Sequence, residues 1–200
     1  MNSPPLFKQL KEQEKQLRKD LIMDAAERVF AKTPFDRVQM REIAAEVGLS
    51  AGAIYTYFPD QETLFLETAL RGARRVQALL DEQLAANAPD LKTAVHLYID
   101  FALAHFEYLR ICQHCMLYGK FTDDHSLEMV TTTSQALFER FDRFLEGRVK
   151  DGEVRLHTHL LFAALNGILF SFGRSPATAK NMAPDHIKTL ADRLVALMGA

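Results

Sequence analysis

The sequence lacks the features that mark several classes of protein. It has no tryptophan and only two cysteines in 200 residues. No apolar run reaches 18 residues, so no membrane span is indicated. The first twenty residues are polar and contain no apolar signal core. We therefore expect a cytoplasmic protein that makes no membrane contact, with both thiols reduced rather than joined in a disulfide.

Residue patterns typical of catalysis are also missing. There is no Ser/His/Asp constellation, no glycine-rich loop to cradle a phosphate and no pair of catalytic carboxylates. Cys112 and Cys115, with His105 and His125 nearby, have a partly zinc-like composition, but no second ligand pair follows at the usual spacing. We predict no enzyme activity, no metal and no cofactor, with the thiols as small buried side chains. A metal-sensing or redox-sensing role for the two cysteines stays open.

An excess of charge of one sign is absent as well. The formal net charge is −2, and residues 1–60 carry nine Lys/Arg and nine Asp/Glu. Residues 1–20 hold five basic and three acidic side chains. A nucleic-acid-binding protein is often basic, so charge alone does not indicate DNA binding. The balance fits a protein that makes few phosphate contacts per subunit and needs a dimer to bind tightly.

The most informative segment is 39–62, QMREIAAEVGLSAGAIYTYFPDQE. Ile43 and Ala44 lie on one face of a short helix, and the small Ala44 lets a second helix approach closely. Gly48 follows where a residue in the left-handed conformation would end that helix. Ser50 is a good N-cap for a second short helix. This layout predicts a helix-turn-helix, in which the second helix lies in the major groove of DNA.

Apolar residues of the second helix are expected to pack against the rest of the domain. Ile54, Tyr55 and Phe58 recur at a spacing of three to four residues, which puts them on the inner face. Thr56 and Tyr57 would then face outward. Tyr55 can still place its hydroxyl at the DNA backbone.

The string I-A-A-E-V-G-L-S-A-G-A-I-Y-T-Y-F-P-D-Q-E-T-L resembles the signature of TetR-family (tetracycline-repressor-like) transcriptional regulators. The family pattern is roughly I-A-x-x-A-G-V-S-x-G-x-L-Y-x-H/Y-F-x-S-K-E-x-L, and the segment from Leu21 to Ala31 fits its first helix. Gln39 replaces a threonine that caps the second helix in the family, and Gln61 replaces a lysine that can reach a phosphate. The resemblance implies a dimeric regulator whose C-terminal domain binds a ligand.

We expect an all-α fold, because no segment alternates apolar and polar residues convincingly. Residues 1–62 would form the N-terminal three-helix DNA-binding domain, with a charged lead-in over 1–20, and residues 63–200 a C-terminal helical bundle for ligand binding and dimerisation. The expected helices lie at about 8–18, 21–31, 39–47, 50–58, 61–86, 90–105, 126–145, 155–172 and 184–198, with a short segment through 116–117.

Candidate DNA contacts are exposed positions in and beside the second helix. Backbone N–H groups at its start can meet a phosphate, basic side chains can do the same, and small apolar groups can touch a thymine methyl. The candidates are Lys19, Arg41, Ser50, Ala51, Gly52, Tyr55, Thr56 and Tyr57. A solvated surface role stays open for each. The acidic Glu42, Glu46 and Asp60 must face away from DNA or be paired.

Aromatic and scattered polar side chains in the C-terminal half indicate a ligand cavity. Asn166 lies in an apolar helix, and a buried amide needs hydrogen-bond partners. The candidate lining residues are Phe101, His105, Met116, Tyr118, Phe138, Phe141, Asn166 and Phe170. Ordinary core packing stays open for each of them. The resemblance also implies a homodimer formed by the last two helices, about 155–172 and 184–198.

The sequence therefore predicts a dimeric repressor that binds a double-stranded DNA operator and is released by a small, largely apolar effector. The helix that starts at Gln61 would span about 38 Å and link the DNA-binding domain to the bundle. One alternative is an activator, or a regulator gated by a protein partner without a small ligand. Another is a helical binding protein or enzyme with a vestigial helix-turn-helix.

Overall fold

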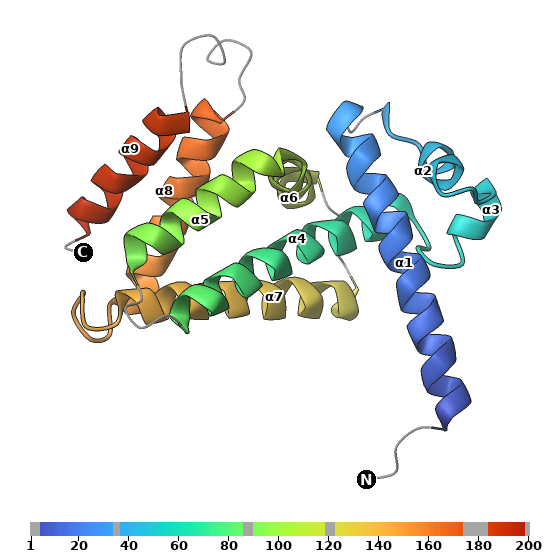
Figure 1. Cartoon of the computed structure of the whole chain (residues 1–200), viewed down its shortest axis with the longest axis horizontal. Coiled ribbons are helices and arrows are strands. Elements are labelled where there is room, and N and C mark those ends of the chain that lie inside the picture. The colour runs from blue at the N-terminus through green and yellow to red at the C-terminus, as the bar shows by residue number, and fades with distance from the viewer. Residues whose placement is uncertain (1–4, 34–36, 86–89, 119–122, 174–183, 199–200) are drawn as a thin grey trace. The chain divides into compact units, whose positions relative to one another are not determined.

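The computed structural model describes residues 5–33, 37–85, 90–118, 123–173 and 184–198. Within these ranges the chain forms α-helices and no strand, which confirms the all-α class (Figure 1). No helix in the described ranges is both long enough and apolar enough to cross a bilayer. The helices are α1 Leu6–Lys32, α2 Met40–Glu46, α3 Ala51–Ile54, α4 Gln61–Leu84, α5 Leu91–Ala104, α6 Phe106–Tyr118, α7 Asp124–Leu145, α8 Val154–Phe172 and α9 Pro184–Leu197.

The first of two compact units comprises residues 1–69 and 107–126. It contains α1, α2, α3, the first part of α4 and nearly all of α6. Phe30 of α1 is fully buried and meets Phe65 of α4 edge-on, with 4.7 Å between the ring centroids. Ile43, from α2, is also fully buried in this unit. Burial of such apolar side chains is the main force that holds short helices in place.

The second compact unit comprises residues 70–106 and 127–200. Here α5 lies beside both α8 and α9 (Figure 1). Asp192 of α9 accepts hydrogen bonds from His96 and Lys92 of α5 at 2.7 and 2.9 Å. The hydroxyl of Tyr98 in α5 donates to Asn166 of α8 at 3.0 Å. Polar contacts as well as apolar packing therefore hold α5 against its two neighbours.

Helix starts follow the capping residues that the sequence predicts. The Ser50 side chain accepts a hydrogen bond from the backbone N–H of Ala53. Asp60 accepts one from the N–H of Thr63 at 2.6 Å. Gln39 makes no side-chain capping bond at the start of α2, as expected from the missing threonine. At Ser50 and Asp60 the predicted helix begins at the capping residue, whereas α7 is capped by Asp123 and begins two residues before the predicted start.

Two features of the first unit differ from the sequence-based expectation. The charged lead-in and the first helix form one continuous helix, α1, because the Lys, Glu and Gln residues of the lead-in are good helix formers. The division at residue 62 assigns α6 to the C-terminal domain, whereas α6 packs within the first unit from Glu107 onward. Contacts between residues far apart in the sequence bring this segment back to α1.

The cap of α5 gives a test of local stability. Asp90 accepts hydrogen bonds from the N–H and the hydroxyl of Thr93, both at 2.8 Å, and the N–H bond is the main cause of a lowered pKa for Asp90. We expect Asp90→Ala to lower the free energy of unfolding by about 1 kcal/mol at pH 7. A carboxylate with a lowered pKa stabilises the fold above its unfolded pKa, and this contribution is lost as pH falls through the folded pKa.

Urea unfolding of both proteins as a function of pH measures this effect. The difference between wild type and Asp90→Ala should shrink as the pH falls below about 4. Asp90→Asn is the matched control, because asparagine caps helices well but does not titrate. An unfolding free energy of Asp90→Ala equal to that of wild type at pH 7 would show that the cap contributes nothing.

Candidate functional site

The segment 40–54 has the geometry of a helix-turn-helix. Gly48, between the two short helices, adopts φ 71°, a conformation that glycine takes at the lowest cost. The N–H of Leu49 donates to the carbonyl of Ala44 at 2.8 Å, which closes the turn. Ile54, at the end of α3, is 0% exposed, and so is Phe58 just beyond it. These two side chains fix α3 to the first unit and leave its other side open.

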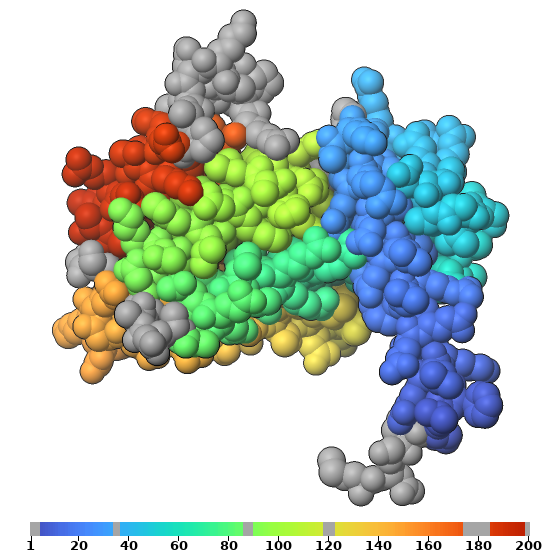
Figure 2. All heavy atoms as spheres, in the orientation of Figure 1, coloured from blue at the N-terminus to red at the C-terminus, as the bar shows by residue number. Residues whose placement is uncertain are grey.

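The open side of α3 consists of small or polar groups. Ala51 and Gly52 are exposed, and an added Cβ on Gly52 would meet no atom within 4 Å. Thr56 is exposed and its hydroxyl donates to the carbonyl of Ala53 at 2.7 Å. In the space-filling view, α3 (cyan) lies at the surface of its unit (Figure 2). A nucleic acid could therefore approach the backbone of α3 closely.

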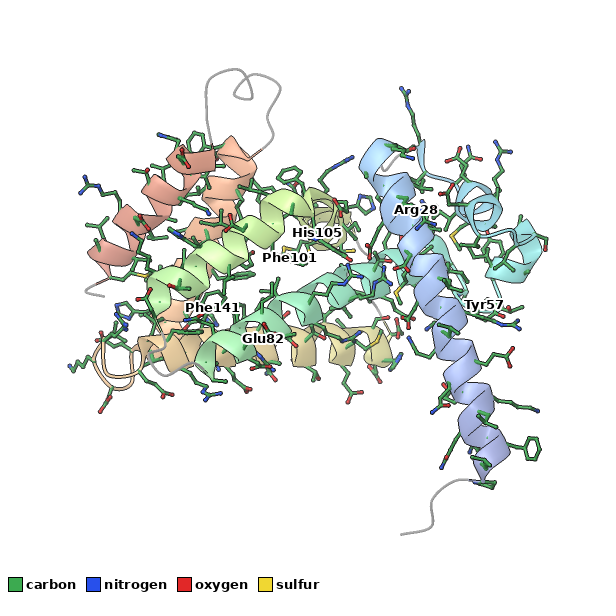
Figure 3. The ribbon with its side chains drawn as sticks, in the orientation of Figure 1. Arg28, Tyr57, Glu82, Phe101, His105 and Phe141 are labelled. Carbon is green, nitrogen blue, oxygen red and sulfur yellow. The ribbon has the colours of Figure 1, made fainter. Side chains whose placement is uncertain are left out.

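The orientations predicted for Tyr55 and Tyr57 are wrong. Tyr55 is 49% exposed rather than packed inward. Tyr57 is half-buried, and its hydroxyl accepts a hydrogen bond from Arg18 of α1 at 3.0 Å (Figure 3). The backbone keeps turning after Ile54, because the N–H groups of Tyr57 and Phe58 both donate to its carbonyl. Tyr55 and Tyr57 then lie on opposite flanks of the inward line from Ile54 to Phe58, and the flank of Tyr57 is the one that meets Arg18. Tyr55, not Tyr57, is the aromatic side chain that projects outward.

The phosphate contact predicted for Lys19 also requires correction. Its ammonium group bonds both carboxylate oxygens of Glu67 at 2.7 Å and lies 4.8 Å from the centroid of the Phe58 ring. The side chain is only 18% exposed. Lys19 therefore joins α1 to α4 and covers Phe58, and it is not free to bind a phosphate.

Other charged groups of the helix-turn-helix lie as expected. Arg41 is exposed on α2, and Ser50 is exposed at the start of α3. Glu46 pairs with Arg28 of α1 at 3.0 Å, so its charge is compensated. Asp60 caps α4. Two of the three acidic side chains that had to be paired or turned away thus have partners, while Glu42 is exposed in the first turn of α2.

Gln61 has a structural role that the sequence did not reveal. Its side-chain amide donates to the carbonyl of Val38, just before α2, at 3.0 Å. Neither residue type signals this contact, since glutamine is common on helix surfaces and the acceptor is a backbone group. The first turn of α4 is thereby bonded to the entry of the helix-turn-helix.

Residues of α6 that the sequence did not single out contact α1 and α4. The hydroxyl of Tyr108 donates to Glu27, and Arg110 donates to the carbonyl of Phe30 at 3.2 Å. The ring of His114 meets Phe65 edge-on at a centroid distance of 5.6 Å. Because these partners lie about 50 to 80 residues apart, no local pattern could have found them.

The two cysteines of α6 are free thiols. Burial is the main cause that raises the pKa of Cys112 to about 11 and that of Cys115 to about 12. Both thiols are thus protonated near neutral pH, and a thiol is a poor metal ligand and a poor nucleophile compared with a thiolate. Over the described ranges, no group of three or more His, Cys, Asp or Glu side chains is placed to hold a metal ion.

Some of the predicted ligand-contact residues come together in the second unit. Phe138 and Phe141 of α7 lie beside an aromatic cluster formed with Tyr98 and Phe162. Asn166 joins the same cluster, because its amide oxygen accepts from Tyr98 and its amide N–H donates to the carbonyl of Phe162. The two polar groups are therefore paired with each other inside an aromatic environment.

The remaining predicted ligand residues are distributed differently. The rings of Phe101 and His105 meet at a tilt of 42°, with 4.8 Å between their centroids, at the C-terminal end of α5 (Figure 3). Met116 is 79% exposed and belongs to the first unit, so its assignment to the pocket is corrected. Phe170 is 36% exposed on the outer face of α8, and we correct its assignment too. The side chain of Tyr118 lies outside the described residues.

Comparisons with known proteins agree with this arrangement. Residues 22–68 match the family described as bacterial regulatory proteins, tetR family. The HTH-type transcriptional repressor Rv1474c of Mycobacterium tuberculosis is 26% identical over 121 residues, which cover 60% of this chain and 64% of that protein. The alignment thus spans less than two thirds of the relative.

Solved structures share the fold over most of the chain. A transcriptional regulator from Rhodococcus sp. Rha1 has a TM-score of 0.72 at 18% identity and covers 90% of this chain and 95% of its own. The regulator FadR from Bacillus subtilis, solved in complex with stearoyl-CoA, has a TM-score of 0.68 at 17% identity, with 90% and 97% covered.

The helix-turn-helix geometry and the match over residues 22–68 show an N-terminal domain of the kind found in bacterial regulatory proteins, and the solved structures show that the all-α fold is shared. Residues 22–68 therefore belong to the tetR family of bacterial regulatory proteins.

Proposed function

We propose that this protein is a dimeric transcriptional repressor that releases its operator when a small, largely apolar ligand binds to the second unit. The observation that supports DNA binding is the exposed side of α3 and of the turn that follows it. Ile54 and Phe58 anchor this segment, and its outward side chains are Ala51, Gly52, Tyr55 and Thr56. Such a surface fits the major groove. Ser50 and Arg41 are the flanking candidates for phosphate contact.

The outer face of α8 supports a homodimer. Leu156, Leu160, Ala163, Gly167 and Phe170 follow one another at alternating spacings of four and three residues, which places them in one stripe. The leucines are 59% and 53% exposed, and an added Cβ on Gly167 would meet no atom within 4 Å. An exposed apolar stripe with a small residue at its centre suits a two-fold helix contact. Leu197 of α9 is 86% exposed and would extend this surface.

The aromatic cluster of the second unit is the proposed ligand site. Phe138, Phe141 and Phe162 supply apolar surface, while Tyr98 and Asn166 supply a polar pair that a ligand's polar end could engage. Ligand sites are usually apolar with a few placed polar groups. The stearoyl-CoA bound by the FadR structure shows that this fold can hold a long apolar ligand in another protein.

The helix α4 is the proposed route of release. It contributes residues 61–69 to the first unit and 70–84 to the second. Its first turn is bonded to Val38 through Gln61, and its Phe65 packs on Phe30. A ligand that binds the two conformations with different affinity would shift α4 and with it the spacing of the two reading helices in a dimer.

A substitution at Gly52 tests whether the exposed side of α3 contacts DNA. We expect Gly52→Glu to lower the affinity for operator DNA by about 100-fold or more, because a carboxylate facing phosphates costs several kcal/mol. The fold should keep its stability, since the space around Gly52 is open. Fluorescence anisotropy with a labelled duplex from upstream of the protein's own gene measures the affinity, and thermal unfolding checks the fold. Gly52→Ala is the control, and wild-type affinity in Gly52→Glu would exclude α3 as the reading helix.

Gly167 tests the dimer. We expect Gly167→Glu to convert dimer to monomer at micromolar concentration, because two buried carboxylates would meet near the two-fold axis. Analytical ultracentrifugation measures the change. Gln135→Glu adds the same charge on the exposed face of α7 and should leave the dimer intact. A dimeric Gly167→Glu protein would rule out this face of α8.

Asn166 tests the ligand site. We expect mass spectrometry of the purified protein to detect a bound apolar compound that Asn166→Leu no longer retains, since leucine keeps the volume but cannot hydrogen-bond. The compound extracted from the wild-type protein is then added to each protein bound to operator DNA. The concentration that releases the DNA should be at least about tenfold lower for wild type than for Asn166→Leu. Gln135→Ala, on the exposed face of α7, should retain the compound. The proposed regulation by a ligand would be contradicted if wild type purified without a bound compound and if no apolar extract weakened its DNA binding.

A further inference from the structure

The N-terminal part of α1 carries a row of basic side chains. Lys8, Lys11, Lys15 and Arg18 are separated by three, four and three residues, so they lie on one face of the helix. All four are exposed. Over the described parts of the chain, the three lysines form no ion pair with an acidic side chain. The three lysines of the row therefore carry positive charge that no ion pair compensates, unlike Lys19, while Arg18 is paired with Glu14.

This basic row continues to the end of the helix-turn-helix. Arg18 donates to the hydroxyl of Tyr57 at 3.0 Å. A shallow hollow next to this bond is lined by Lys11, Glu14, Lys15, Arg18, Thr56 and Tyr57. The acidic member of this lining, Glu14, bonds Arg18 at 2.5 Å, so its charge is neutralised there and Lys11 and Lys15 stay uncompensated. A DNA backbone that passes Thr56 would meet these lysines next.

The length of the row sets how far along a duplex it could reach. The ten residue-to-residue steps from Lys8 to Arg18 rise about 15 Å along a helix. At 3.4 Å per base pair, this distance corresponds to about four base pairs. The dark-blue N-terminal part of α1 extends past α2 and α3 within its unit (Figure 2), and the four side chains of the row are exposed.

We propose that Lys8, Lys11, Lys15 and Arg18 bind backbone phosphates of the duplex beside the half-site read by α3. Each subunit would then cover about four base pairs more than the helix-turn-helix alone. The inference rests on the proposed DNA-binding function and extends it to flanking DNA. Because phosphates are the same in every sequence, the basic row adds affinity without adding sequence preference.

The operator is first located by footprinting with the wild-type protein. The test then compares wild type with Lys11→Gln/Lys15→Gln on two duplexes that both contain this operator. One duplex extends ten base pairs beyond each half-site, and the other is trimmed to the half-site ends. Arg143→Gln/Lys150→Gln is the control, since it removes two exposed positive charges from the second unit. Binding is measured by fluorescence anisotropy at several salt concentrations between 50 and 200 mM.

We expect trimming to weaken wild type and the control but to leave Lys11→Gln/Lys15→Gln nearly unchanged. The slope of log K against log salt should become shallower in this variant by about 0.9 for each phosphate that it no longer neutralises. Each neutralised phosphate changes the affinity ratio between 50 and 200 mM salt by about 3.5-fold. Discrimination between operator and random duplex should stay the same in all three proteins.

A variant with the wild-type salt slope and the wild-type response to trimming would overturn the inference while leaving the proposed function intact. Wild type that shows no preference for operator over random duplex would instead refute the proposed function, and the inference with it. A third arm uses vesicles of phosphatidylserine and phosphatidylcholine. Vesicle binding by wild type that the double variant loses, without any change in DNA binding, would assign the row to membranes and also overturn the inference.

Discussion

A helix of four residues cannot hold its shape through its own backbone hydrogen bonds, so α3 depends on the burial of Ile54 and Phe58. The composition of the exposed face of α3 depends on this anchoring. The two side chains fix which face of α3 is covered by the first unit, and the exposed face then consists of whatever residues remain. Here those residues are small, so the backbone itself lies close to the surface.

The anchoring extends from α3 into the rest of the first unit. Lys19 lies over the ring of Phe58 and is bonded to Glu67, which ties α3, α1 and α4 together. The Lys19–Glu67 pair is mostly buried. Removing one partner would leave the other charge buried without compensation, which is strongly destabilising. Together with the Gln61–Val38 bond, it makes the first turns of α4 part of the first unit. A displacement of the first turns of α4 would therefore move the contacts that hold α3 in place.

Local chemistry explains which features the sequence predicts well. Ser50, Asp60 and Asp90 start helices because each accepts a backbone N–H, and Gly48 ends α2 because it adopts a positive φ. The predictions fail where the geometry is not local. Tyr57 rather than Tyr55 meets α1 through Arg18, which lies 39 residues away, and the partner that occupies Lys19 lies 48 residues away. The packing of α6 on α1 depends on pairs such as Tyr108 and Glu27, which no sequence pattern marks.

The return of α6 to the first unit has a consequence for synthesis of the chain. Residues 1–69 emerge from the ribosome first, but the unit also requires residues 107–126. Phe65 lacks its His114 neighbour, and Glu27 its Tyr108 partner, until that later segment appears. At about 5 to 20 residues per second, the wait after Ala69 is roughly 3 to 11 s. The first unit is thus discontinuous in sequence, and its later segment emerges only when more than half of the protein has been made.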